Sequence, residues 1–439
     1  MSRPPKRPDR LKVLLIAFHF PPFKGSSGLE RTLAFCRSLP ARGWQPMVLG
    51  AHPRAFARTS DERVGDIPTG VRVERPFALD TVRHLSIRGR HLPWMALPDR
   101  WASWLIGAIP RGLRMIRQER PRAIWSTYPI ASAHWIGWAL HRLTKLPWIA
   151  DFRDPMVEYN QREQYYAPRD PRLRRARLRI ERLCARHAAR VVFCTEGARR
   201  IFLERYPDFP ADRALIIPNG FDEASFAGLD AAAPAGPNAK HTLTLLHSGV
   251  LYPGPDRDPS AFLQAVRRLV DEAPEWKSRL RIRLRASGYL TTYAAMIANL
   301  GLQEIVELAP SVPYRAALAE MMAVDGLLVF QGYTSNPAIP AKLYEYLRAR
   351  RPILALTDGD GDTAALLRKL NVGTVLPIKE SSAIESGLKA FLGELDAGTA
   401  RVLAPEKCAD FDRTRGADAL AQILDAVALQ SENNSGSMR

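Results

Sequence analysis

The part of the sequence that decides the fold reads Ser335-Asn-Pro-Ala-Ile-Pro-Ala-Lys-Leu-Tyr-Glu-Tyr-Leu-Arg-Ala-Arg-Arg-Pro-Ile-Leu354. It passes from a polar loop into a helical pattern and then into a strand-like apolar run. Ser335 or Asn336 can accept hydrogen bonds from the free amides of the first helical turn, and the two prolines suit a helix entrance. A positive helix end of this kind stabilises an anion. The stretch therefore predicts a binding site for a nucleoside diphosphate.

Two charged side chains follow inside this predicted helix. Lys342 and Glu345 are spaced so that both project from one helix face. The lysine would bind a phosphate, and the carboxylate could accept hydrogen bonds from both hydroxyls of a ribose. The alternative for this spacing is an exposed Lys–Glu pair that binds no ligand.

Short apolar runs alternate with helical patterns along the chain. This alternation is typical of parallel sheets that are covered by helices. We therefore expect two doubly wound α/β domains. The first set of strand-like runs covers 11–18, 46–49, 71–73, 123–126, 148–151, 190–194 and 214–217. The second set covers 241–248, 280–286, 305–308, 326–330, 352–356 and 372–376.

Composition suggests where the domains end. An Ala/Pro/Gly-rich segment between the two sets of strands is typical of a linker. Two Rossmann-like domains would face each other across a cleft at the carboxyl ends of their strands, where ligands bind in open α/β folds. The expected parts are a disordered N-terminus (1–10), an N-terminal acceptor-binding domain (11–225), the linker (226–240), a C-terminal nucleotide-sugar-binding domain (241–410), a helix that packs back on the N-terminal domain (411–430) and a disordered tail (431–439).

The overall composition is that of a globular protein. The 439 residues are 46% hydrophobic, which suffices for two cores. No apolar run reaches the roughly 18–20 residues that span a bilayer, and the N-terminus lacks the apolar segment of a signal peptide, so we expect a cytoplasmic protein. The cysteines lack metal-ligand spacing and are interpreted as reduced packing residues. They are Cys36, Cys184, Cys194 and Cys408.

The net charge of +18 indicates an anionic partner. The sequence contains no zinc-finger spacing, aromatic RNA-binding strand or comparable module, so no nucleic acid is expected. A phosphorylated substrate or an anionic membrane surface fits the charge better. Between 83 and 120, tryptophans and aliphatic residues alternate with arginines, as in segments that lie at a lipid headgroup interface. An ordinary core-packing helix is the alternative for this segment. The apolar residues of the pattern are Trp94, Trp101, Trp104, Leu105, Ile109, Leu113 and Ile116.

Five segments, in this order, resemble the retaining family-4 group of GT-B fold glycosyltransferases. The resemblance covers most of the chain. It implies a nucleotide-sugar donor held mainly by the C-terminal domain, an acceptor held by the N-terminal domain, retention of anomeric configuration, and neither a metal nor another cofactor. The segments are Phe20-Pro-Pro-Phe-Lys-Gly-Ser-Ser-Gly28, Ala150-Asp-Phe-Arg-Asp-Pro155, Ile217-Pro-Asn-Gly-Phe-Asp222, His247-Ser-Gly-Val-Leu-Tyr252 and the helix with Lys342 and Glu345.

The resemblance implies where the donor diphosphate binds. Gly249 ends the first strand of the second domain, and many relatives carry a basic residue directly after it, where this chain has Val250. Arg257 and Lys342 therefore become the candidate cations that stabilise the leaving diphosphate, with Arg285 as a weaker third. A glycine-serine loop after the first strand would lie beside the diphosphate and the reacting sugar, with Arg31 as a possible added charge. The loop residues are Gly25, Ser26, Ser27 and Gly28.

Three charged residues at the end of a strand are candidates to position the acceptor or the donor sugar. They are Asp151, Arg153 and Asp154, and the alternative is that they pair with one another. Many relatives have a histidine where this chain has Thr127, and a sugar-binding glutamate where it has Pro337. The amides around Asn336, Ala338 and Ile339 could replace the missing side-chain contacts.

The sequence therefore predicts a glycosyltransferase that moves a sugar from a nucleoside diphosphate to a glycan or lipid-linked acceptor in cell-surface polysaccharide or glycolipid synthesis. It would act in the cytoplasm, either free or bound to the inner face of the membrane. The rival hypotheses are a non-catalytic GT-B scaffold and, with less support, a nucleotide-sugar epimerase. The acidic segment Asp358-Gly-Asp-Gly-Asp362 resembles a metal-binding cluster, but alternating Asp and Gly after a strand is ordinary turn chemistry.

Overall fold

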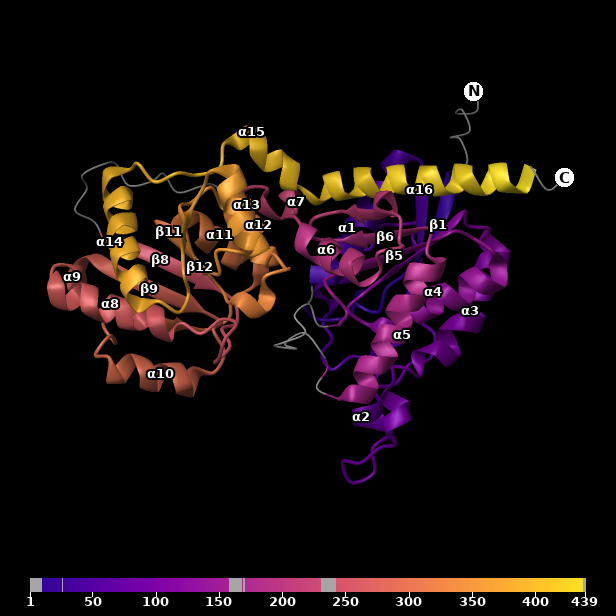
Figure 1. Ribbon diagram of the computed structural model, residues 1–439, viewed down its shortest axis with the longest axis horizontal. Helices are drawn as coiled ribbons and strands as arrows, with labels where there is room; N and C mark the ends of the chain where they lie inside the picture. The colour runs from indigo at the N-terminus through magenta and orange to yellow at the C-terminus, as the bar shows by residue number, and fades with distance from the viewer. Residues whose placement is uncertain (1–9, 26, 158–167, 169, 230–241, 437–439) are drawn as a thin grey trace. The chain divides into compact units, whose positions relative to one another are not determined.

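The computed structural model describes residues 10–25, 27–157, 168, 170–229 and 242–436. The chain divides into two compact units (Figure 1). The first unit comprises Met1–Asn219 and Arg413–Arg439, and the second comprises Gly220–Asp412. The boundary therefore lies before the segment 226–240 that we expected to be a linker, and most of that segment is outside the described residues.

The first unit is built on a seven-stranded sheet with the order β3-β2-β1-β4-β5-β6-β7. All its neighbouring strands run parallel. This is the strand order of a doubly wound fold, in which helices cover both faces. The strands are β1 (Leu11–Ile16), β2 (Trp44–Leu49), β3 (Arg72–Glu74), β4 (Ala123–Thr127), β5 (Trp148–Arg153), β6 (Arg190–Phe193) and β7 (Ala214–Ile216).

The first strand shows why this sheet is buried on both faces. Leu14 and Ile16 belong to one hydrophobic cluster, while Val13 and Leu15 belong to another. Successive side chains of a strand point to opposite faces, so a continuous apolar run needs cover on both sides. That cover comes from α1 (Ser27–Ser38), α3 (Trp104–Glu119), α4 (Ala131–Thr144), α5 (Pro171–His187), α6 (Glu196–Arg205) and α16 (Arg413–Gly436). The unit also contains α2 (Thr81–His84) and the 3-10 turns η1 (Leu39–Arg42), η2 (Pro53–Ala55), η3 (Asp61–Arg63), η4 (Pro93–Ala96) and η5 (Ala211–Arg213).

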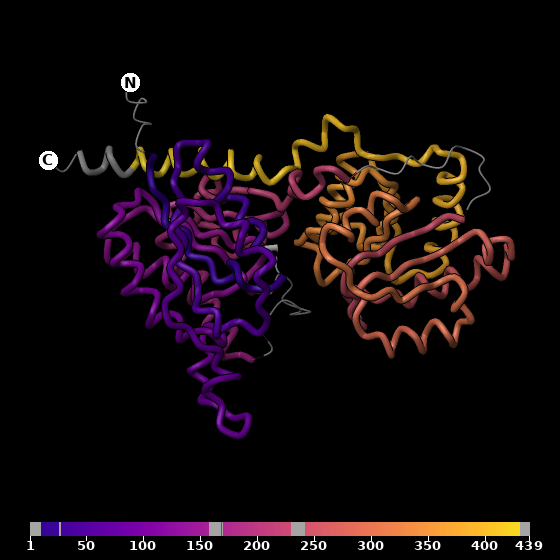
Figure 2. The backbone as a smooth tube through the Cα atoms, turned by 180° about the vertical axis from the view of Figure 1, so that it is seen from behind, coloured from indigo at the N-terminus to yellow at the C-terminus, as the bar shows by residue number. Residues whose placement is uncertain are grey.

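The last helix, α16, lies along the first unit beside α1 (Figures 1 and 2). Leu420, Leu424 and Val427 join the hydrophobic cluster that holds Val13 and Leu15. A polar contact fixes the position of α16 along the sheet, because Trp44 Nε1 of β2 donates to Asp425 Oδ1 of α16 over 2.8 Å. The helix continues to Gly436, past the point at which we expected a disordered tail.

The second unit has a six-stranded parallel sheet with the order β10-β9-β8-β11-β12-β13. Its β12 again alternates, with Leu354 and Leu356 in one cluster and Ile353 and Ala355 in the other. The predicted α/β class with two doubly wound sheets is therefore confirmed. The strands are β8 (Leu243–Ser248), β9 (Leu280–Arg285), β10 (Val306–Ala309), β11 (Gly326–Gln331), β12 (Ile353–Thr357) and β13 (Thr374–Leu376).

The helices of the second unit are α7 (Glu223–Phe226), α8 (Ser260–Glu272), α9 (Trp276–Arg279), α10 (Leu290–Asn299), α11 (Tyr314–Ala323), α12 (Ala341–Ala349), α13 (Asp362–Leu370), α14 (Ser381–Ala397) and α15 (Pro405–Cys408), with the 3-10 turns η6 (Tyr333–Ser335) and η7 (Ala409–Phe411). Helices α8, α10, α11, α12, α13 and α14 each follow a strand, so their N-termini lie toward the carboxyl edge of the sheet.

Candidate functional site

Gly249 lies directly after β8 at the carboxyl edge of the second sheet. Its φ of 122° is unfavourable for any residue with a Cβ. An added Cβ would also lie 2.7 Å from Lys342 Nζ. The glycine thus allows the lysine of α12 to reach the backbone at the end of β8. The structure thus brings together Gly249 and Lys342, two of the residues that the sequence predicts to bind the donor.

A buried histidine holds this lysine. His247 Nδ1 lies 2.8 Å from the carbonyl oxygen of Leu328, and Lys342 Nζ lies 3.2 Å from His247 Nε2. Burial and the charge of Lys342 keep the pKa of His247 well below its usual value, so the ring is neutral. Burial, followed by the charge of Arg257, lowers the pKa of Lys342 to about 7, while Glu345 acts in the opposite direction. The lysine is therefore easily deprotonated until an anion arrives.

Arg257 lies on the loop between β8 and α8, close enough for its charge to act on Lys342. Its guanidinium carbon lies 5.4 Å from the centre of the Tyr252 ring, and its Nε lies 3.4 Å from Asp256 Oδ2. Ser335 Oγ donates to Asp256 Oδ1 over 2.5 Å. This hydrogen bond connects the loop that carries Arg257 to the loop that precedes α12. The segments that position the two candidate cations, Arg257 and Lys342, are therefore linked to each other.

Glu345 lies one turn after Lys342 on α12. Its Oε1 accepts a hydrogen bond of 2.8 Å from the hydroxyl of Tyr314, the first residue of α11. The side chain is partly exposed, so it can also accept hydrogen bonds from a ligand. The tyrosine orients the carboxylate, and the sequence alone did not reveal this contact.

The loop before α12 differs from the sequence prediction. The helix begins at Ala341 after Pro340, and no side chain caps it. Ser335 is not the predicted cap, because it lies in the 3-10 turn before the loop and the helix begins only at Ala341; its hydroxyl donates to Asp256.

Two of the three amides expected to contact the donor are already used. The Asn336 amide donates to the Tyr333 carbonyl, and the Ala338 amide donates to the Ser335 carbonyl. The third predicted residue, Ile339, packs its side chain against a hydrophobic cluster. The weaker cation candidate, Arg285, forms an ion pair with Glu320 at 2.6 Å.

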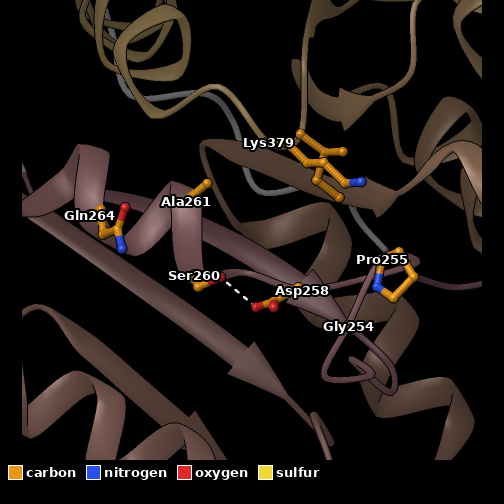
Figure 3. Close-up of a pocket in the computed structure, with 8 residues that line it drawn as sticks. Gly254, Pro255, Asp258, Ser260, Ala261, Gln264 and Lys379 are labelled. Atoms are coloured by element: carbon orange, nitrogen blue, oxygen red, sulfur yellow. Dashed lines mark hydrogen bonds between the residues drawn. The ribbon is translucent and has the colours of Figure 1, made fainter.

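A separate cavity of about 400 Å³ opens beside the loop that carries Arg257 (Figure 3). Asp258 Oδ1 accepts from the Ser260 amide over 2.9 Å at the start of α8, and Lys379 approaches from the loop after β13. None of the residues predicted to bind the donor lines this cavity. Its lining consists of Gly254, Pro255, Asp258, Ser260, Ala261, Gln264, Ile378 and Lys379.

In the first unit, the predicted glycine-serine loop leads into α1. Gly25 is exposed and has a φ of 77°, Ser26 is outside the described residues, and α1 begins at Ser27. Gly28 is buried, and its carbonyl accepts a hydrogen bond of 3.0 Å from the Thr32 hydroxyl. The loop is therefore an entrance to a helix, as predicted.

Arg31 and Asp151 form a buried ion pair at the carboxyl edge of the first sheet. Arg31 Nε and Nη2 lie 3.1 and 3.3 Å from the two carboxylate oxygens. The hydroxyl of Thr127 also donates to Asp151, and Arg31 reaches the carbonyl of Pro218. Asp151 has no exposed surface. The geometry therefore favours a structural role for this pair over the acceptor contact expected of Asp151 and the diphosphate contact considered for Arg31.

Arg153 and Asp154 lie where β5 ends in an irregularity of its register. Arg153 has a φ of 61°, which is strained for a residue with a side chain, and its Nη1 donates to the Tyr128 carbonyl. Burial raises the pKa of the Asp154 carboxyl, against the charge of Arg153. Of the three predicted acceptor residues, Asp154 alone is more than marginally exposed.

Other parts of the sequence prediction concern metals and packing. Among the described residues, no group of three His, Cys, Asp or Glu side chains is placed to hold a metal ion. Asp358 instead accepts hydrogen bonds from Asn336 and from the Asp360 amide, as a turn residue does.

Within the described part of the chain, no helix has the length and apolar character of a membrane span. All four cysteines are buried and free.

Comparisons with known proteins agree with this fold. A glycosyltransferase from Rickettsia africae aligns with 95% of this chain and 99% of its own, with a TM-score of 0.66 and 11% identity. Anabaena HepE in complex with UDP-glucose covers 95% and 100%, with a TM-score of 0.61 and 14% identity. WaaG, a glycosyltransferase involved in lipopolysaccharide biosynthesis, covers 94% and 99%, with a TM-score of 0.59 and 14% identity. No curated protein sequence matches the chain.

These likenesses define a protein with the GT-B fold. Residues 28–220 match the family described as the glycosyl transferase 4-like domain. The predicted resemblance to GT-B glycosyltransferases of the family-4 group is confirmed, and the family match over residues 28–220 supports glycosyl transfer as the class of activity.

Proposed function

We propose that this protein transfers a sugar from a nucleoside diphosphate donor to a glycan or lipid-linked acceptor, with retention of anomeric configuration. The observation that carries the proposal is the contact of Lys342 with the Gly249 backbone at the carboxyl edge of the second sheet, with Arg257 on the adjoining loop near enough for its charge to lower the pKa of the lysine. This edge is where open α/β sheets bind ligands. Two cations beside a glycine are suited to a diphosphate.

The same residues fit the chemistry of donor cleavage. Negative charge develops on the diphosphate as the glycosidic bond breaks, and a fixed cation stabilises it more in the transition state than in the ground state. Lys342 is held by His247, so little reorganisation is needed when the charge appears. Glu345, oriented by Tyr314, would accept hydrogen bonds from the ribose hydroxyls. The complex of Anabaena HepE with UDP-glucose supports a nucleotide-sugar as the donor type.

On this proposal the acceptor is bound by the first unit. Asp154 is the candidate to position the acceptor hydroxyl, because it is partly exposed and lies beside the strained Arg153. The loop of Gly25, Ser27 and Gly28 remains a predicted donor contact. A role in surface polysaccharide or glycolipid synthesis, on the cytoplasmic face of a membrane, would fit an acceptor that is itself lipid-linked.

The experiment is thermal stabilisation by UDP-, GDP- and ADP-sugars, because a ligand that binds only the folded state raises the melting temperature. We expect one base to be selected, with the shift lost in Glu345→Ala. The matched control is Glu223→Ala, which removes an exposed carboxylate of the same unit that pairs with Arg348. No shift with any nucleotide would contradict the proposal.

The second candidate is a non-catalytic scaffold with this fold. It is favoured by Val250, Thr127 and Pro337, which occupy positions where many relatives carry functional side chains. The Thr127 hydroxyl is already engaged by Asp151. Measuring the release of nucleoside diphosphate from the selected donor distinguishes the transferase from the scaffold, because only the transferase cleaves the donor. Donor binding without release, with and without candidate acceptors, would favour the scaffold.

A further inference from the structure

A tight hairpin turn lies between α2 and η4 in the first unit. The Ile87 amide donates to the Arg90 carbonyl over 2.8 Å, and the Arg90 amide donates to the Ile87 carbonyl over 3.0 Å. Arg88 and Gly89 between them have φ angles of 51° and 76°. Two successive left-handed residues are typical of a type I′ turn. Beyond α2 this loop extends away from the rest of its unit (Figures 1 and 2).

Several apolar side chains of this loop are exposed. Ile87 is 80% exposed, Trp94 is 68% exposed and Leu92 is 57% exposed. Single exposed apolar residues are normal on a protein surface, but three within eight residues on a projecting loop form a patch. Val82, at 45%, extends it toward α2. We name residues 82–94 the docking loop.

The charge around this patch has one sign. Residues 81–98 contain three arginines, Arg83, Arg88 and Arg90, and no aspartate or glutamate. Among the described residues, neither Arg88 nor Arg90 has an ion-pair partner. The flanking acids cannot neutralise them. Asp80 pairs with Arg100 over 2.5 Å, and Asp99 accepts from the Ser132 amide over 2.7 Å.

The helix that follows is not part of this surface. The sequence placed the apolar stripe of α3 at a possible membrane interface, but Trp104 has no exposed surface and Ile116 is 9% exposed. Trp101, Leu105 and Ile109 pack against the same core. The core-packing alternative is therefore correct for α3. Of the three tryptophans in the pattern, Trp104 is buried, Trp101 is partly buried and Trp94 is exposed.

We propose that the docking loop binds an anionic phospholipid surface. Ile87, Leu92 and Trp94 would enter the interfacial layer, and Arg88 and Arg90 would contact headgroup phosphates. Apolar side chains combined with unpaired arginines fit a bilayer, whose surface offers both acyl chains and negative charge. A stable protein interface needs about 800 Å² on each partner, which is more than one projecting turn supplies. This inference rests on the proposed function in one respect, namely that the acceptor is lipid-linked.

The test is co-sedimentation of the full chain with vesicles of phosphatidylcholine, with and without 30 mol% phosphatidylglycerol, at about 50 and 300 mM salt. The double variant Ile87→Ser/Trp94→Ser should weaken partitioning at least tenfold at both salt concentrations. Arg88→Asn/Arg90→Gln should weaken it about five- to twentyfold at low salt and much less at high salt. Asparagine is chosen at position 88 because it tolerates the left-handed backbone.

The matched control is Ile106→Ser/Leu143→Ser, which removes two apolar residues that are 73% and 62% exposed and lie outside the docking loop. It should partition like the wild type. Equal binding to neutral and anionic vesicles, or equal loss in the control, would overturn the proposal. So would a dimer that the Ile87→Ser/Trp94→Ser change converts to a monomer, because a second copy would then be the occupant.

Failure of this inference can be told from failure of the proposed function. Donor-induced thermal stabilisation should be the same in wild type and both docking-loop variants, since the loop contributes no donor-binding residue. If the wild type is stabilised by a donor but does not bind vesicles, the membrane proposal is refuted and the glycosyltransferase proposal stands. If the wild type binds vesicles but no donor raises its melting temperature, the glycosyltransferase proposal is refuted and the membrane proposal stands.

Discussion

Lys342 Nζ lies 3.2 Å from His247 Nε2, and His247 Nδ1 lies 2.8 Å from the carbonyl oxygen of Leu328. A carbonyl oxygen can only accept, so Nδ1 carries the ring hydrogen and Nε2 accepts from the lysine. The strand end thereby fixes the position of the cation on α12. Burial and the charge of Arg257 lower the pKa of this lysine, which makes donor binding depend on pH.

Donor affinity should fall as the pH rises above neutrality. The pKa of Lys342 is about 7 in the free protein, and the protonated form binds the diphosphate. Above pH 7 the protonated fraction falls tenfold per unit, so the protein must take up a proton on binding. We expect roughly tenfold weaker UDP binding per pH unit between about pH 7.5 and 9, measured by calorimetry in buffers of different ionisation enthalpy. Lys342→Met should bind weakly at every pH, and a flat profile for the wild type would contradict this assignment.

Gly249→Ala should abolish most donor binding. The added Cβ would lie 2.7 Å from Lys342 Nζ and would displace it. Gly254→Ala is the matched control, because its φ of 111° imposes comparable backbone strain while an added Cβ there meets no atom within 4 Å. We expect donor affinity to fall at least tenfold in the first variant and less than threefold in the second, with both folded by circular dichroism. Equal losses would assign the effect to the backbone of the loop.

Tyr314→Phe should weaken donor binding about three- to tenfold, because it removes the hydrogen bond that orients Glu345. Calorimetry with the selected nucleoside diphosphate measures the change. Tyr293→Phe is the control in the same unit, since its hydroxyl has no hydrogen-bond partner among the described residues. An unchanged affinity in Tyr314→Phe would separate Glu345 from the ribose.

The sequence was sufficient for the fold because both sheets are covered on two faces. Strands of this kind appear as continuous apolar runs, and β1 and β12 are examples. The meeting of Gly249 and Lys342 could also be predicted, because a glycine after one strand and a charged helix after another converge at the same sheet edge.

The contacts that orient these groups could not be predicted in the same way. His247 and Tyr314 act through single hydrogen bonds across elements that are far apart in sequence, and no local pattern encodes them. The cap expected at Ser335 is absent because α12 begins six residues later, at Ala341, and the Ser335 hydroxyl instead donates to Asp256, another distant partner. The apolar stripe of α3 has the same sequence pattern whether it packs against a protein core or binds a membrane. Amphipathicity alone therefore could not decide between the two.

Arg31→Met should destabilise the first unit by about 3–5 kcal/mol, because it leaves the carboxylate of Asp151 buried without its ion-pair partner. Urea unfolding followed by tryptophan fluorescence reports mainly on this unit, since eight of the nine tryptophans, all but Trp276, belong to it. The double variant Arg31→Met/Asp151→Leu should recover much of the loss by removing both charges. Arg200→Ala is the surface control, and we expect a change within about 0.5 kcal/mol because its pair with Glu204 is exposed.

The same variants decide between a structural and a substrate-binding role for the pair. If the pair is structural, the double variant should retain transfer activity near that of the wild type at temperatures where both are folded. If Asp151 holds the acceptor, the double variant should be stable and inactive, with an unchanged affinity for the donor. The full burial of Asp151 and its engagement by both Arg31 and Thr127 lead us to expect the first outcome.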